Sequence, residues 1–495
     1  FNNDHLLDLM HCSWGLRDQL RYFVNTGSGT FVEKTAEASL TGIVGGLNLI
    51  SADYNNDGFQ DVFVLRGAWL ENEGHHPNSL LRNNGDGTFS DVTEEAGLLS
   101  FHPTQTAVWF DYNNDGHLDL FIGNESVPRD INPCELFRNN SDGTFSEVSL
   151  VSGVRVVGQV KGVASGDYNN DGRADLFLSI IGANNILLRN EGPDEQKLWR
   201  FTDATKSAGV AAPRMSFPCW FWDYNNDGWD DLFVAGYKIN GVGDLAAEYL
   251  GLPNKAEHPR LYRNNKNETF TDVTKEAKLD RIIHAMGSNY GDLDNDGYLD
   301  FYAGTGDPSL ESLMPNLMFR NNRGQSFQDV TTAGGFGHLQ KGHGVSFGDF
   351  DNDGDQDVYA VMGGAFSGDA YMNVLFENPG HENGWVKLLL TGTKSNRNAI
   401  GARIRITVLT PTGKQLIYNT VSTGGSFGGN PFRREIGLGA ATRIEEIAIR
   451  WPGSTELQSF TSLKLRTAYA IREGDSSIRE VQLPSVQKSS NQRTP

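Results

Sequence analysis

A nine-residue acidic segment recurs six times along the chain and limits its fold more than any other feature. It has the form Asp-x-[Asn/Asp]-x-Asp-Gly-x-x-Asp, and successive copies begin 58, 56, 56, 69 and 57 residues apart. The copies cover residues 53–61, 111–119, 167–175, 223–231, 292–300 and 349–357. A nearly fixed period of this length is typical of architectures in which each repeat is one supersecondary unit.

A second repeated element lies between the acidic segments, and Leu80 to Thr93 is its clearest copy. Its Asn-Asn-Gly-Asp-Gly centre predicts a tight β-hairpin, because Asn, Asp and Gly tolerate positive φ. Apolar residues such as Val62 to Val64 follow each acidic segment and predict buried strands. Each unit should therefore hold four antiparallel strands. Six such units predict an all-β fold, with a β-propeller of six four-stranded blades.

An N-terminal copy of the hairpin, Arg21 to Thr35, has no acidic segment of this form before it. We expect it to supply outer strands to the last blade and so close the ring, which gives six blades. A seventh, incomplete blade is the alternative. The long repeat interval is explained by an insertion at 237–259, where Asp244 to Leu250 predict a short helix. That insertion and the loop at 125–133 differ most between repeats, so we predict the ligand surface there.

The acidic segments have the composition of calcium-binding loops. Calcium takes six to eight oxygen ligands, and positions 1, 3, 5 and 9 offer side-chain oxygens while position 7 offers its carbonyl. The loops lack the Glu at position 12 that an EF-hand needs, and magnesium is the weaker alternative. About six structural calcium ions are predicted. The predicted ligands are Asp53, Asn55, Asp57, Phe59, Asp61, Asp111, Asn113, Asp115, His117, Asp119, Asp167, Asn169, Asp171, Arg173, Asp175, Asp223, Asn225, Asp227, Trp229, Asp231, Asp292, Asp294, Asp296, Tyr298, Asp300, Asp349, Asp351, Asp353, Asp355 and Asp357.

Charge and hydropathy exclude two classes of function. Asp and Glu number 62 against 42 Lys and Arg, a formal net charge of -20, which argues against nucleic acid as a partner. No apolar run approaches the ~18 residues of a membrane span, so we expect a protein that is not embedded in a membrane. The three cysteines are not at zinc-ligand spacing, and whether Cys134 pairs with Cys219 is left open.

The chain is predicted to divide into four parts. An N-terminal segment covers 1–19, the propeller 20–384, a small C-terminal β-sandwich 385–475 and a polar tail 476–495. The sandwich is expected because acidic loops cease after Asp357 and strand-length apolar runs such as Ala402 to Val408 follow.

Two parts of the chain resemble known families. Segments such as Ser165 to Gly172 and Phe347 to Gly354 resemble FG-GAP/VCBS calcium-loop propellers. Residues 385–474 resemble the ASPIC/UnbV domain, with Gly392 to Arg403 and Ile449 to Gly453 as its marks. The pairing is similar to that in the cartilage acidic protein family and its bacterial relatives. The resemblance implies an extracellular or periplasmic protein with calcium-dependent folding and a binding or adhesion role.

The ASPIC/UnbV resemblance has one departure. Gly428 to Arg434 does not have the Ser-Gln-containing form expected after Gly424 to Phe427, so a binding role carried over to that loop is in doubt.

The sequence predicts no catalytic residue. Gly424 to Gly428 matches the Gly-x-Ser-x-Gly nucleophile elbow, but Gly-Asn-Pro follows where a helix should begin, so we interpret the match as accidental. The favoured hypothesis is a secreted calcium-stabilised propeller that binds a glycan, an extracellular protein or copies of itself. A carbohydrate-active lyase or dehydratase is the alternative, since propellers host both roles. A structural role in a surface layer or fibre is a third hypothesis.

Overall fold

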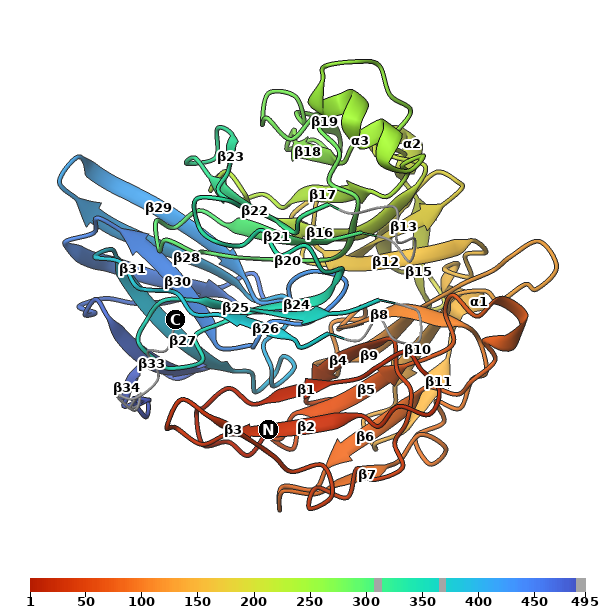
Figure 1. Ribbon diagram of the computed structural model, residues 1–495. Helices are drawn as coiled ribbons and strands as arrows, with labels where there is room; N and C mark the ends of the chain where they lie inside the picture. Colours follow the sequence, from red (N-terminus) through yellow and green to blue (C-terminus); the bar gives the residue numbers. More distant parts are fainter. Residues whose placement is uncertain (307–313, 365–370, 487–495) are drawn as a thin grey trace.

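The computed structural model describes residues 1–306, 314–364 and 371–486, and strands dominate it. Its helices are short: α1 (Ser149–Ser152), α2 (Thr205–Ala208) and α3 (Val242–Tyr249), with a 3₁₀ turn η1 at Glu71–Glu73. Helix α3 lies in the insertion where the sequence predicts one (Figure 1). The chain is therefore all-β, as predicted.

Five of the acidic repeats form four-stranded antiparallel sheets whose strands are neighbours in sequence order. Inner strands lie near the centre of Figure 1 and the short outer strands near its rim. The five sheets comprise β4 (Asn48–Ala52), β5 (Asp61–Leu65), β6 (Ser79–Asn83) and β7 (Phe89–Asp91); β8 (Thr104–Phe110), β9 (Asp119–Asn124), β10 (Glu135–Asn139) and β11 (Phe145–Glu147); β12 (Gln159–Gly166), β13 (Asp175–Ile181), β14 (Ile186–Pro193) and β15 (Trp199–Asp203); β16 (Ser216–Trp222), β17 (Asp231–Gly236), β18 (Arg260–Asn264) and β19 (Phe270–Asp272); and β20 (Ala285–Gly291), β21 (Asp300–Thr305), β22 (Leu317–Asn321) and β23 (Phe327–Asp329).

The prediction for the N-terminal hairpin was wrong in one respect. Its strands β2 (Arg21–Asn25) and β3 (Phe31–Glu33) join β1 (Leu9–His11) in a separate three-stranded sheet. The last repeat forms its own sheet of β24 (Gly342–Gly348), β25 (Asp357–Met362) and β26 (Val374–Phe376). The ring thus has seven blades, which was the alternative.

A repeated asparagine contact joins each blade to the one before it. The side-chain amide of an Asn within the third strand, at its end or two residues beyond it donates to the position-2 carbonyl of the preceding acidic loop. For example, Asn139 Nδ2 lies 2.9 Å from the Tyr54 carbonyl. The same contact links Asn190 to Tyr112, Asn264 to Tyr168, Asn321 to Tyr224 and Asn378 to Leu293. Asn25 donates to Phe350 and Asn83 to Phe1, so the N-terminal blade lies between the last repeat and the first.

The first eight residues explain this closure. Phe1-Asn2-Asn3-Asp4-His5-Leu6-Leu7-Asp8 matches positions 2 to 9 of the acidic loop, with His5 where the other loops have Gly. His5 has φ of 67°, in the left-handed region that position 6 requires. Asp8 accepts the backbone N–H of Asn25 at 2.9 Å, just as Asp61 accepts that of Asn83 at 2.8 Å. The segment is a seventh copy that the sequence search missed.

Aromatic and aliphatic side chains fill the space between neighbouring blades. Trp109 on β8 packs against Tyr54 and Phe63 of the preceding blade, and Trp220 on β16 packs against Phe301 of the next. Both indoles are fully buried, so they serve packing between blades.

Two further four-stranded sheets follow the ring and form a sandwich. One is ordered β30-β27-β33-β34 and the other β29-β28-β31-β32, and residues from both form a single apolar core. The strands are β27 (Gly384–Thr391), β28 (Arg403–Thr410), β29 (Gly413–Thr420), β30 (Arg434–Gly439), β31 (Arg443–Arg450), β32 (Leu457–Phe460), β33 (Thr467–Arg472) and β34 (Arg479–Val481). Strand β34 lies in the part predicted to be a tail, whose residues 487–495 lie outside the described residues.

Candidate metal centre

The six acidic loops share one hydrogen-bond pattern that places their carboxylates side by side. In the first loop, Asp53 accepts the backbone N–H groups of Asp57 and Gly58 at 2.9 and 2.8 Å. Asp61 accepts the N–H of Tyr54 at 3.3 Å, which brings position 9 back beside the start of the loop. The position-1 contacts recur in the other five loops, in Asp111, Asp167, Asp223, Asp292 and Asp349.

A second asparagine at position 4 links neighbouring loops into a ring. Asn56 Nδ2 donates to the Gly116 carbonyl of the next loop at 3.1 Å, and each later loop repeats the contact. The remaining pairs are Asn114–Gly172, Asn170–Gly228, Asn226–Gly297, Asn295–Gly354, Asn352–His5 and Asn3–Gly58. These asparagines have positive φ, near 50–60°, which explains why position 4 is Asn in every loop. The acidic loops therefore form one continuous ring.

Burial raises the pKa of the carboxyl groups at positions 1 and 9. The pKa of Asp53 rises to about 6 and that of Asp61 to about 8, with the Asp57 carboxylate adding to both. For Asp300, burial and then the carboxylates of Asp294 and Asp292 raise the pKa well above the usual range. A cation within the loop would favour the ionised forms and offset this cost.

Two observations support a hard cation as the ligand of these loops. Asp231 Oδ2 and Asp294 Oδ1 are buried and have no hydrogen-bond partner in the described part of the chain. In the fifth loop, one carboxylate oxygen each of Asp292, Asp294 and Asp300 lies within 4.8 Å of the others, and Asp349, Asp351 and Asp353 form a similar set in the sixth. Carboxylate oxygens are the kind of donor that calcium prefers, and each set supplies three of the six to eight that it takes.

The sixth loop differs from the others because a buried lysine enters it. Lys387 Nζ donates to Asp349, and both side chains are almost fully buried. Arg433 and Glu435 extend the network, and Glu435 accepts the Asp349 backbone N–H at 3.0 Å. A monovalent side-chain cation thus already neutralises Asp349, which the sequence pattern alone did not indicate.

The C-terminal sandwich covers the ring of acidic loops and contacts all six. Basic groups reach several of the carboxylates, as when Arg403 Nη2 approaches Asp230 at 2.6 Å and Arg397 Nε lies 3.6 Å from Asp53. Backbone and amide contacts complete the set: Asn398 to Asp53, Lys394 beside Gly116, Arg403 to Asp167, Tyr418 to Asn226, Gly439 to Asn295 and Glu435 to Asp349. The loops therefore hold the two parts of the chain together.

A glycine-rich loop of the sandwich, residues 423–431, enters the centre of the ring. Ser426 Oγ accepts the N–H of Cys219 at 2.9 Å, and the Ser426 carbonyl accepts from Asn48 at 3.3 Å. Gly425 N donates to Asn289 Oδ1 at 2.6 Å, and Val345 N donates to the Phe427 carbonyl at 3.3 Å. This central loop therefore contacts the inner strands of several blades. Ser426 has a structural role, because its hydroxyl and its carbonyl both accept hydrogen bonds from the blades.

A buried group of side chains near the ring axis was missed by sequence reasoning. Lys161 is fully buried, pairs with Glu125, and lies with its ammonium 3.1 Å from the Trp69 ring centroid. Trp69 stacks on Phe217 of a distant blade at 5.9 Å. We call Trp69, Glu125, Lys161 and Phe217 the axial cluster. Lys161 and Phe217 lie on the innermost strands β12 and β16, Trp69 and Glu125 lie in loops, and only folding brings the four residues together.

The structure also locates the other candidate features of the sequence. Glu125, in the loop at 125–133, belongs to the axial cluster. The insertion exposes Tyr249 and Leu250 at the end of α3. No helix follows Ser426 in the described residues up to β30, so the nucleophile-elbow interpretation is excluded, as expected. Cys12, Cys134 and Cys219 are free thiols, so Cys134 and Cys219 are not bonded to each other.

Comparison with known families gives two matches. The FG-GAP-like repeat profile matches residues 1–64, 67–122, 111–178, 223–303 and 309–360, which together make up more than half of the chain. The profile named ASPIC and UnbV matches residues 392–478. The first repeat match begins at residue 1, in agreement with the seventh copy of the acidic loop.

Curated relatives share only part of their length with this chain. Cartilage acidic protein 1 of Xenopus tropicalis is 27% identical over 168 residues, and the human protein 28% over 162. These alignments cover 33% and 32% of this chain, and 23% and 24% of the relatives.

Solved structures resemble the fold only loosely. The exotype rhamnogalacturonan lyase YesX has a TM-score of 0.36 at 13% identity, covering 92% of this chain and 76% of that one. The six-bladed Aleuria aurantia lectin has a TM-score of 0.32 at 8% sequence identity. The alignment covers 66% of this chain and 96% of the lectin. Among the described residues, no helix has the length and hydropathy of a transmembrane span.

Proposed function

Because this chain belongs to the family of FG-GAP-like repeat proteins and carries an ASPIC and UnbV domain, we propose that it is a secreted, calcium-loaded β-propeller with a binding or adhesion role. The observation that carries the proposal is the ring of acidic loops, where buried carboxylates converge and, among the described residues, Asp231 Oδ2 and Asp294 Oδ1 have no hydrogen-bond partner. Calcium would be held by the carboxylate and amide oxygens at positions 1, 3, 5 and 9.

The metal's role in this proposal is structural. Calcium would neutralise carboxylates whose pKa burial has raised, and it would fix the face on which the C-terminal sandwich rests. Loops of extracellular modules bind calcium at about 10⁻⁴–10⁻³ M, so such sites fill where calcium is millimolar and stay empty in the cytosol. This supports a location outside the cytosol, in the extracellular space or the periplasm.

A binding role is favoured over catalysis because the proposal already assigns the carboxylates of the repeats as metal ligands. The partner would be a glycan, an extracellular protein or another copy of the chain, and it would bind the surface that the sandwich leaves uncovered. The exposed apolar residues of the α3 insertion, such as Tyr249, support a protein-facing surface there.

The test is calcium titration calorimetry of the whole chain and of two matched variants. Asp300→Asn removes a buried position-9 carboxylate, whereas Asp86→Asn changes an acidic residue in an exposed hairpin turn. The proposal predicts one site fewer in Asp300→Asn and an unchanged number in Asp86→Asn. Absence of calcium binding to the unsubstituted chain would refute it.

The axial cluster favours a second function, that of a carbohydrate-active enzyme such as a lyase or dehydratase. Burial lowers the pKa of Lys161 to about 8, a shift that is also common in catalytic lysines. An activity screen on polysaccharides with the chain and its Lys161→Met variant separates the two functions. Turnover by the unsubstituted chain that is lost in Lys161→Met would support the enzymatic function. Absence of turnover on every polysaccharide tested would favour the binding function.

A further inference from the structure

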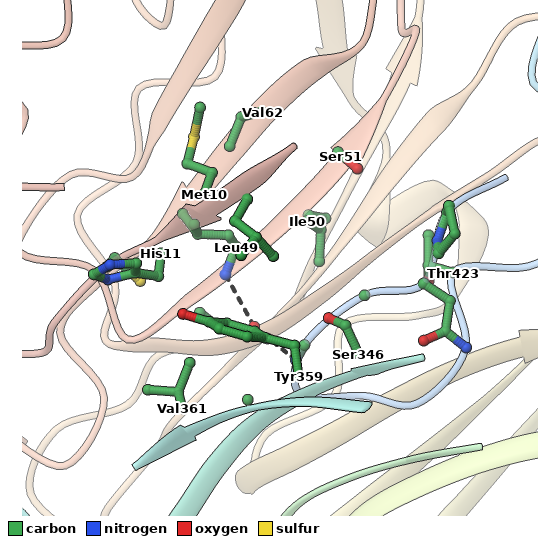
Figure 2. Close-up of a pocket in the computed structure, with 18 of the residues that line it drawn as sticks. Met10, His11, Leu49, Ile50, Ser51, Val62, Ser346, Tyr359, Val361 and Thr423 are labelled. Atoms are coloured by element: carbon green, nitrogen blue, oxygen red, sulfur yellow. Dashed lines mark hydrogen bonds between the residues drawn. The ribbon is translucent and has the colours of Figure 1, made fainter. Parts of the chain in front are cut away.

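The sixth acidic loop, residues 349–357, receives a buried cation from the C-terminal sandwich. The loop joins β24 to β25, in which Ser346 and Tyr359 lie opposite each other (Figure 2). Lys387 of β27 donates its ammonium group to Asp349 Oδ2, and the two side chains are 1% and 0% exposed. The position-1 carboxylate, a predicted calcium ligand, therefore already has a cation as its partner.

The hydrogen bonds of Asp349 leave less room for a metal ion than those of its equivalent in the fifth loop. There, each carboxylate oxygen of Asp292 accepts one backbone N–H group from within the loop. Asp349 accepts the two equivalent N–H groups, at 3.1 and 2.7 Å, and its Oδ2 accepts from Lys387 in addition. A carboxylate oxygen offers about two lone pairs, so both lone pairs of Asp349 Oδ2 are used.

Four side chains around Asp349 balance one another's charge. Lys387 lies opposite Glu435 in the register of β27 and β30. Glu435 accepts the Asp349 backbone N–H at 3.0 Å and pairs with Arg433 at 2.7 Å. Arg433 in turn donates to the Asp349 carbonyl at 3.0 Å. Two cations and two carboxylates thus form a group that is neutral without a metal ion.

The basic side chains near the other acidic loops are more exposed. Among the described residues, those within 4 Å of a predicted ligand carboxylate in the first five loops are Arg397 beside Asp53, Arg450 beside Asp167, Arg173 beside Asp171, Lys266 beside Asp227 and Arg320 beside Asp294. Their side chains are 30 to 46% exposed, so they can turn into water when a metal ion binds. The buried ammonium of Lys387 cannot do so.

We propose that the sixth loop binds no calcium, and that Lys387 takes the place of the ion and attaches the sandwich to this loop without metal. The inference rests on the proposed function, which assigns calcium to the other acidic loops. Three carboxylates converge in the sixth loop and would suit calcium on their own. A divalent ion beside them, however, would meet the repulsion of an ammonium group held in a buried site.

The first test counts bound calcium by native mass spectrometry in two matched variants, Asp57→Asn in the first loop and Asp353→Asn in the sixth. Both residues occupy position 5 and accept the position-7 N–H, at 2.9 and 3.0 Å, and asparagine keeps this acceptor. Asp57→Asn should bind one ion fewer than the unsubstituted chain, and Asp353→Asn the same number. One ion fewer in Asp353→Asn overturns the inference but leaves the proposed function intact.

The second test follows amide exchange with and without EGTA. In EGTA, the amides at 57–58 should exchange faster, because Asp53 loses its metal partner, while those at 353–354 should keep their protection. Equal acceleration at 353–354 in the unsubstituted chain contradicts the inference.

Two lysine variants separate this inference from the proposed function. Lys387→Met should accelerate exchange at 353–354 in EGTA, and added calcium should restore protection, because the ion can then enter the loop. Lys266→Met is the control, since Lys266 is 46% exposed beside Asp227 and its loss should leave exchange at 227–228 unchanged in calcium. Unchanged exchange at 353–354 in Lys387→Met overturns the inference. If EGTA affects no loop in the unsubstituted chain, the proposed function fails, whereas faster exchange in Lys387→Met would still support attachment through Lys387.

Discussion

Asn25 donates its side-chain amide to the carbonyl of Phe350 at 2.9 Å, although the two residues are 325 positions apart. The contact repeats at the last junction what Asn139 and Tyr54 do at an internal one. Because every junction uses the same bond, the ring closes without any strand shared between its ends.

Asn25→Ala should lower the free energy of unfolding by about 1–3 kcal/mol, because it leaves a buried carbonyl without its donor. Urea denaturation measures this. Asn84→Ala is the matched control, since Asn84 sits in an exposed hairpin turn and its loss should change stability by less than about 0.5 kcal/mol. Equal effects of the two substitutions would mean that the junction bond does not close the ring.

Gly425→Ala should displace the central loop, whereas Gly429→Ala should not. A Cβ at Gly425 would lie 2.0 Å from the Ser288 carbonyl, but one at Gly429 would meet nothing nearer than 4.0 Å. The first variant should show faster amide exchange at 423–431 and a lower melting temperature. Similar exchange in both variants would show that the loop does not depend on close backbone contact.

Lys161→Met should change how stability varies with pH. The pKa of Lys161 is lowered to about 8 by burial, with Glu125 acting in the opposite direction, while an unfolded lysine titrates near 10.5. Between these two pKa values the unfolded state binds more protons than the folded state. The contribution of Lys161 to the free energy of unfolding therefore rises with pH, by at most about 1.4 kcal/mol per pH unit. Urea denaturation from pH 7 to 10 should show the rise in the unsubstituted chain relative to Lys161→Met. Parallel curves would contradict the shifted pKa.

Lys387→Met should make the chain more dependent on calcium. Removing one partner of a buried ion pair costs about 3–5 kcal/mol, and a divalent ion at Asp349 could replace the lost charge. The calcium-induced rise in melting temperature should therefore be larger than in the unsubstituted chain. Lys414→Met, which breaks an exposed pair with Glu445, is the control and should leave that rise unchanged. An equal rise in Lys387→Met would exclude a calcium site at Asp349.

The repeat made the propeller predictable because each acidic loop carries its signal within nine consecutive residues. The seventh copy escaped because His5 replaces the glycine and because the position-1 Asp is not among its eight residues. The contacts of Asp8 and Asn25 identify it in the structure, and the repeat profile that begins at residue 1 agrees with them. The number of blades was therefore the part of the fold that the sequence left open.

The axial cluster and the central loop were beyond prediction for a different reason. Lys161 and Trp69 come from separate blades, and nothing in either segment indicates that an ammonium lies over an indole. Ser426 lies in a glycine-rich stretch that resembles a catalytic motif, and its partner Cys219 is 207 positions away. Such contacts depend on the ring geometry, which local patterns do not encode.

The most direct test of the account is calorimetric melting of the full chain in millimolar calcium, in EGTA, and after calcium is restored, with bound calcium counted by mass spectrometry. Each site filled at ten times its Kd adds about 1.4 kcal/mol, so about six sites predict a large fall in melting temperature with EGTA that calcium reverses. An unchanged melting temperature in EGTA, with no calcium bound at millimolar concentration, would contradict the account.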